Sequence, residues 1–126
     1  MAKEIVYTKQ APEAVGPYSQ AVTENGLVFC SGQVPLDPTS GELLEGSIAD
    51  ETRRAMDNLK AVLEAAGSSF DKVVKVTAYL VDMNDFVEFN GVYGEYFTDA
   101  PPARATVGVA ALPKGARVEV ECVAIA

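Results

Sequence analysis

The chain has 126 residues, of which 48% are hydrophobic, and carries a formal net charge of −8. This length fits one compact domain over 1–126, and the acidic balance disfavours binding to nucleic acids or anionic membranes. Histidine is absent, which excludes Ser/His/Asp and Cys/His nucleophile systems and metal sites that need a histidine ligand.

The first third of the chain has the pattern of three strands. Residues 3–8 and 17–23 mix polar and apolar side chains, as outer strands do. Residues 26–31 form a more continuous apolar run, which predicts a buried strand ending at Gly32. The segment 33–46 is broken by prolines and glycines and is expected to be a loop.

A long amphipathic helix follows. Ser47 is a suitable N-cap, and Asp50 stands three positions later as its capping-box partner. Apolar residues then recur at helical spacing, which predicts a helix over 48–66 that ends at Gly67.

The middle of the chain predicts one more strand and one more helix. Residues 72–81 are rich in β-branched side chains, and both alternating sets are substantially apolar, which favours a strand covered on both faces. A helix is expected over 85–97. Its aromatic residues are most simply interpreted as core packing against a sheet.

The last part of the chain predicts a hairpin, with strands over 103–110 and 117–125 and a turn at 112–115. The resulting order, β-β-β-α-β-α-β-β, indicates an α+β fold in which two helices pack on one face of a mixed sheet. Two helices cannot cover both faces. The apolar residues of the second face therefore predict contact with another subunit.

This hairpin suggests a reactive surface. If it closes tightly, Thr106 lies opposite Glu121, and Arg104 is the diagonal neighbour on the same face. Arg104 stands between two alanines in an apolar strand, so it needs a partner, either a substrate anion or a neighbouring acid. Glu119 and Glu121 share one face, and solvent exposure or pairing with Arg104 and Arg117 is their structural alternative.

Three further residues are site candidates. The phenol of Tyr18, beside a Gly-Pro pair, either packs or contacts a small substrate. Gly32 either ends a strand or lets a backbone N–H approach a ligand. Asn90, among the helix aromatics, is either a polar link in the core or a wall of the site.

The two cysteines, Cys30 and Cys122, both lie in apolar strand-like stretches. They are expected to be buried free thiols, which indicates a reducing, cytoplasmic location. Catalytic or disulfide roles are the alternatives. No apolar run is long enough to span a bilayer, and neither a metal nor a cofactor is expected.

Several of these segments, in their order and near spacing, resemble the signatures of the Rid family of reactive-intermediate deaminases. The matching residues are 16–21 (GPYSQA), 31–35 (SGQVP), 84–86 (NDF) with Asn90 and Tyr93, 102–104 (PAR) and 118–121 (VEVE). The resemblance covers about residues 12–125. Within the family, an arginine followed by the glutamate equivalent to Glu121 marks the active deaminase branch.

The resemblance implies a chorismate-mutase-like fold and a homotrimer with three sites, each built from two chains. It implies hydrolysis of 2-imino or 2-enamino acids, such as 2-iminobutanoate and 2-iminopropanoate, to 2-oxo acids and ammonia. Arg104 would bind the substrate carboxylate, and Glu121 would polarise a water or exchange a proton with the substrate nitrogen. Tyr18, Asn90 and the backbone around Gly32 would complete the pocket.

One departure from the family concerns Thr106, because many active members have cysteine there. Thr106 is expected to keep water binding at this position. The substrates would come from pyridoxal-phosphate dehydratases that act on threonine or serine. The alternatives are a non-enzymatic small-molecule-binding or chaperone-like trimer and, disfavoured by the acidic charge, RNA cleavage or inhibition of translation.

Overall fold

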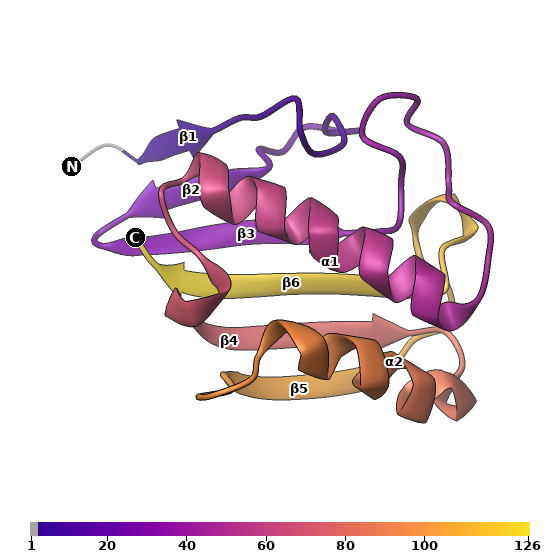
Figure 1. The fold of residues 1–126 in the computed structure, drawn as a ribbon. Helices are drawn as coiled ribbons and strands as arrows, with labels where there is room; N and C mark the ends of the chain where they lie inside the picture. Colours follow the sequence, from indigo (N-terminus) through magenta and orange to yellow (C-terminus); the bar gives the residue numbers. More distant parts are fainter. Residues whose placement is uncertain (1–2) are drawn as a thin grey trace.

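A computed structural model describes residues 3–126. Six strands form one mixed sheet in the order β1-β2-β3-β6-β4-β5, in which only the β4–β5 pair is parallel (Figure 1). Their bounds are β1 Glu4–Val6, β2 Ala21–Glu24, β3 Leu27–Gln33, β4 Val73–Leu80, β5 Ala103–Gly108 and β6 Val118–Ile125.

Two helices, α1 (Ile48–Ala65) and α2 (Phe86–Tyr93), lie side by side on the same face of the sheet (Figure 1). The α+β order and the one-sided helix layer predicted from the sequence are therefore confirmed. The second helix is shorter than the predicted 85–97, because 3-10 turns at Met83–Asp85 and Gly94–Tyr96 flank α2.

The hydrophobic core lies between the helices and the sheet. Phe89, Met56, Leu59 and Val120 are fully buried in it. Cys30 and Cys122 are direct cross-strand neighbours in the same core, and both are free thiols as predicted. Among residues 3–126, no helix has the length and apolar character needed to cross a membrane.

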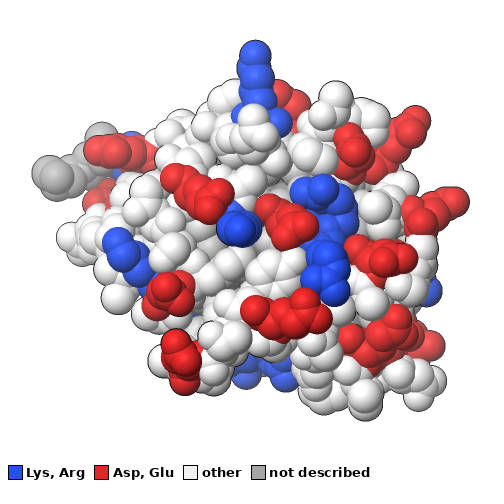
Figure 2. Space-filling view, in the orientation of Figure 1, with Lys and Arg blue, Asp and Glu red and all other residues white. Residues whose placement is uncertain are grey.

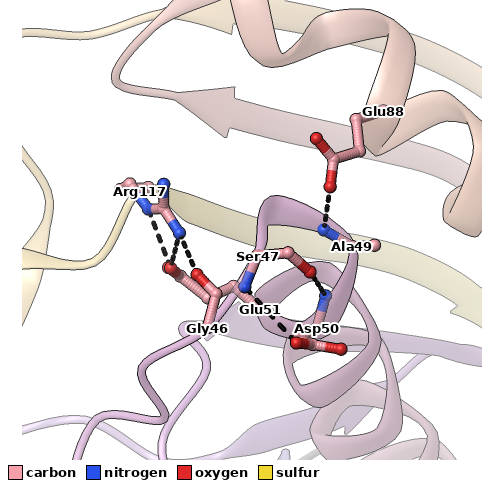
Figure 3. A network of polar contacts seen from close by, with 7 residues as sticks. All are labelled: Gly46, Ser47, Ala49, Asp50, Glu51, Glu88 and Arg117. Atoms are coloured by element: carbon pink, nitrogen blue, oxygen red, sulfur yellow. Dashed lines mark hydrogen bonds and ion pairs between the residues drawn. The ribbon is translucent and has the colours of Figure 1, made fainter.

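The start of α1 is tied to both α2 and β6 (Figure 3). Ser47 and Asp50 form the predicted capping box. A carboxylate oxygen of Glu88 in α2 accepts the backbone N–H of Ala49 at 3.0 Å. Arg117, just before β6, pairs with the buried Glu51. One turn of helix thus fixes how three elements meet.

The predicted hairpin between the last two strands is wrong. β5 pairs with β4, in parallel, and β6 lies between β3 and β4. The turn itself exists, since Lys114 and Gly115 adopt positive φ values of 60° and 72°. It carries the chain past β4 to the far side of that strand instead of back along β5.

The face of the sheet opposite the helices is open in a single chain. Ile5, Val22, Phe29 and Val123 pair in sequence across four strands and form an apolar row on it. The Phe29 side chain is 44% exposed and Ile5 is 67% exposed. The sheet therefore has a second apolar face, as the sequence indicated.

Candidate functional site

The register of β5 decides which way the candidate residues point. Arg104 and Thr106 pair with Val76 and Ala78 of β4, which are fully buried under the helices. Directly paired residues point to the same face, so Arg104 and Thr106 lie on the helix-covered face. Glu121 lies on the open face. The predicted surface that combines Arg104, Thr106 and Glu121 is therefore wrong within one chain, because β4 separates their strands.

Helix α2 orients Arg104. The Nη1 atom of Arg104 donates a hydrogen bond to Oδ1 of Asn90 at 2.8 Å. The guanidinium carbon lies 4.7 Å from the ring centroid of Tyr93, 5.6 Å from Phe86 and 5.9 Å from Phe89. Such contacts attract a cation to an aromatic ring. Together they hold the planar guanidinium group on the edge strand of the sheet.

Arg104 makes no ion pair within residues 3–126. The salt bridge to a neighbouring acid, which was the structural alternative for this residue, is therefore not formed in the chain. The Thr106 hydroxyl, two residues along the same face, is buried and lacks a hydrogen-bond partner among the described residues. This edge thus offers a fixed cation and a hydroxyl.

A separate pocket with a volume of about 310 Å³ lies between the loop at 12–18, the end of β3 and the start of β6. Tyr18, Gly32 and Glu119 line it, together with Glu13 and Lys114. Tyr18 is 47% exposed, and its hydroxyl accepts the backbone N–H of Val15 at 3.2 Å. The predicted residues Tyr18 and Gly32 are therefore brought together.

Gly32 and Glu119 are in close contact inside this pocket. A Cβ atom at position 32 would lie 2.1 Å from Oε2 of Glu119, closer than real Cβ contacts come. The absence of a side chain at Gly32 therefore makes room for the carboxyl. Burial raises the pKa of Glu119, and the negative charge of Glu121 raises it further.

Hydrogen bonds from the side chains of Gln20, Ser31 and Asn58 hold the walls of the pocket in place. Gln20 is 3% exposed and donates to the carbonyl of Pro12 at 2.8 Å. The Ser31 hydroxyl donates to the carbonyl of Ser19 at 2.6 Å, which ties the loop that carries Tyr18 to β3. Asn58 of α1 donates to two carbonyls of the segment after β3. The loops around the pocket are thus anchored to regular elements.

Glu121 lies outside the residues that line the pocket and bonds to β4 instead. The hydroxyl of Tyr79 donates to Oε1 of Glu121. This hydrogen bond, with burial as a smaller cause, raises the pKa of Tyr79 to about 12. The site residues predicted from the sequence did not include Tyr79, and they favoured Glu121 over Glu119. The signal for Glu119 was present, since it shares a strand face with Glu121, but only the structure tells the two apart.

The candidate residues thus form three groups in one chain. Tyr18 and Gly32 line the pocket with Glu119. Arg104 and Thr106 lie on the edge strand, where Asn90 of α2 bonds to Arg104. Glu121 bonds to Tyr79. No group of three histidine, cysteine, aspartate or glutamate side chains within residues 3–126 could hold a metal ion.

Comparison with known proteins gives matches over nearly the whole chain. The model of the family described as endoribonuclease L-PSP matches residues 8–126. A human protein named 2-iminobutanoate/2-iminopropanoate deaminase is 47% identical over 125 residues, which is 99% of this chain and 91% of that protein. A Pyrococcus abyssi protein named only as a RutC family protein is 49% identical, with 98% of each chain covered.

Solved structures agree with this result. A Yersinia pestis protein, described as a protein of unknown function of the conserved Rid protein family, superposes with a TM-score of 0.96. It is 46% identical, and the match covers 99% of this chain and 100% of that one.

Proposed function

Because the chain belongs to the endoribonuclease L-PSP family, which includes the Rid proteins, we propose that it hydrolyses 2-imino and 2-enamino acids. The substrates would be 2-iminobutanoate and 2-iminopropanoate, and the products the 2-oxo acids and ammonia. The observation that carries this proposal is the 47% identity, over 99% of the chain, to a human protein named for that reaction.

The site would be built from two copies of the chain. In one copy, the pocket with Glu119 and the guanidinium of Arg104 lie on opposite faces of the sheet. Arg104 stands on β5, the edge strand, where a second copy can approach it. Docking that edge against the neighbour's pocket would place a cation beside the carboxyl. Lys114 is the one basic residue among those that line the pocket.

The chemistry needs little more than placement and proton transfer. Arg104 would bind the substrate carboxylate with its planar fork and so hold the imine carbon beside a water. Addition of the water gives a carbinolamine, and its collapse releases ammonia and leaves the 2-oxo acid. Both steps move protons, which is general acid–base catalysis worth about 10²–10⁴-fold.

The structure favours Glu119 over Glu121 as the group that moves these protons. Glu119 lines the pocket beside Tyr18 and Gly32, whereas Glu121 accepts a hydrogen bond from Tyr79. A partly desolvated carboxyl with a raised pKa exchanges protons more readily near neutral pH. The sequence pointed to Glu121, and substitution of each glutamate compares the two directly.

The binding or chaperone-like alternative keeps the same fold without turnover. RNA cleavage has weaker support, because a phosphate backbone is attracted by clustered positive charge. Here the net charge is −8, and basic and acidic side chains are intermingled on the helix-covered face (Figure 2).

A coupled assay tests the proposal. Threonine dehydratase generates 2-iminobutanoate in the presence of semicarbazide, and release of 2-oxobutanoate is measured with and without the protein. We expect acceleration by the wild type, and loss of it in Arg104→Ala and Glu119→Gln. An assembled wild type that accelerates neither iminobutanoate nor iminopropanoate hydrolysis would favour the binding alternative.

Mixed assemblies test whether two chains share one site. Co-expression of Arg104→Ala and Glu119→Gln chains, each inactive alone, should restore activity in roughly a quarter of the sites by random pairing. No recovery in a verified mixed assembly would argue that both residues act within one chain.

A further inference from the structure

Three polar side chains, those of Tyr79, Glu119 and Glu121, are neighbours on the open face of the sheet. Glu119 and Glu121 are two residues apart on β6, so their side chains point to the same face of the sheet. Tyr79 of β4 is the direct cross-strand partner of Glu119, yet its hydroxyl bonds to Glu121. Tyr79 therefore spans the two glutamates. The function proposed above uses one carboxyl of this group and leaves the other two members without a role.

We infer that Tyr79 and Glu121 are positioning residues, in which the Tyr79 hydroxyl holds the Glu121 carboxylate beside Glu119 so that Glu119 keeps a proton for exchange. The part of this inference that concerns catalysis rests on the proposed function. The control of Glu119 protonation by Tyr79 and Glu121 does not depend on that function.

The hydrogen bond has a defined direction. The Tyr79 hydroxyl donates and an oxygen of Glu121 accepts. This bond fixes the Glu121 carboxyl on the strand face that also carries Glu119, two residues away along β6. Like charges at short range disfavour ionisation of the second group. The raised pKa of Glu119, caused by burial and then by Glu121, agrees with this geometry.

Other charged and titratable groups also face Glu119. They are Tyr79 on β4, Glu121 on its own strand, and Glu13, Tyr18 and Lys114 around the pocket. Only burial and Glu121 raise the pKa of Glu119. The positive charge of Arg104 from a second copy would lower the pKa of Glu119. A difference between variants of one assembled protein therefore isolates the effect of Glu121.

The test is a ¹³C NMR titration of the glutamate side-chain carboxyls in the intact, assembled protein. We expect the Glu119 midpoint to fall in Glu121→Gln. It should fall by a smaller amount in Tyr79→Phe, because the released carboxylate can turn away from Glu119. Glu4→Gln on β1 is the matched control and should leave the midpoint unchanged. Both substitutions at the group are close to isosteric, and assembly is checked by light scattering.

Activity supplies a second readout. The limb of the pH–kcat profile that reports Glu119 should move to lower pH in Glu121→Gln, with KM unchanged. An unchanged Glu119 midpoint in both Glu121→Gln and Tyr79→Phe would overturn the inference. A wild type with no deaminase activity would reject the proposed function instead, and the NMR midpoints would still decide whether Tyr79 and Glu121 control Glu119.

Discussion

Gly32 shows how one missing side chain makes room for a neighbouring carboxyl group. Glu119 occupies the space that a Cβ atom at position 32 would need. The end of a glutamate side chain is flexible, so a larger residue would displace the carboxyl and leave the backbone in place. Position 32 should therefore affect function more than stability.

Gly32→Ala is expected to lower kcat by about 10²-fold, as loss of a general acid–base group does. The accompanying destabilisation should stay below about 1 kcal/mol, because only the end of Glu119 must move. Steady-state kinetics and thermal unfolding measure the two effects. Gly91→Ala is the control, since a Cβ there meets nothing within 4 Å and should leave activity intact.

Ionisation of Glu119 should make the folded protein less stable as pH rises. Its pKa in the folded chain is raised, so its protonated form is favoured by folding. Its stabilising contribution is full below the unfolded carboxyl pKa of about 4.3 and is lost as pH rises through the folded value.

We therefore expect the wild type to become less stable relative to Glu119→Gln as pH rises from acidic to neutral. Denaturant unfolding at a series of pH values and one protein concentration measures this difference. A constant difference across the series would show that the folded chain does not raise the pKa of Glu119.

At this scale the sequence picks out candidate residues, but it does not predict how they are grouped in one chain. Arg104 in an apolar strand and Tyr18 beside Gly-Pro are conspicuous without a structure. The choice between Glu119 and Glu121 is not visible, because both have the same strand parity. Two features of the structure distinguish the glutamates: Glu119 lies against Gly32, and Glu121 accepts a hydrogen bond from Tyr79.

At the scale of secondary-structure elements, the first turn of α1 is bonded both to α2 and to the residue that precedes β6 (Figure 3). Glu51 is almost fully buried there, and Arg117 supplies its counter-charge. Removing one partner of a buried pair leaves an uncompensated charge, which costs more than the pair itself contributes. An exposed pair lacks this penalty.

Arg117→Ala is accordingly expected to lower the free energy of unfolding by about 2–3 kcal/mol. Arg53→Ala removes a pair with Glu95 in which both side chains are about half exposed, and should cost less than about 1 kcal/mol. Denaturant unfolding of both variants compares them. Equal losses would mean that Glu51 is not effectively buried.

The contrast between α1 and the last two strands shows what a sequence can predict about elements. The capping box of α1 is local, and Ser47 and Asp50 specify it within four residues. Strand partners are not local. The pattern strand–turn–strand fits a hairpin, but here the turn leads β6 into the gap between β3 and β4. Nothing within residues 103–125 distinguishes these outcomes.

At the scale of the whole molecule, the face of the sheet opposite the helices exposes apolar side chains. Its apolar row includes Phe29, which is 44% exposed. The proposed composite site also needs a second copy. Both observations support an assembly that covers the open face of the sheet, for which we propose three copies.

Phe29→Asp should therefore dissociate the assembly and abolish deaminase activity, because a buried, unpaired carboxylate would oppose association. Val87→Asp is the matched control. Val87 is 82% exposed on α2, away from the sheet face, and its substitution should leave mass and activity unchanged. Light scattering coupled to size-exclusion chromatography gives the mass. A monomeric wild type would contradict the assembly.

The place of β6 between β3 and β4 also sets when the domain can form. β6 follows both neighbours along the chain. During synthesis, the segments that carry β1 to β5 leave the ribosome before the strand that joins them. Until residues 118–125 follow, β3 and β4 have unpaired backbone groups that can pair with other chains. Nascent chains at this stage are therefore expected to be the species most prone to aggregation.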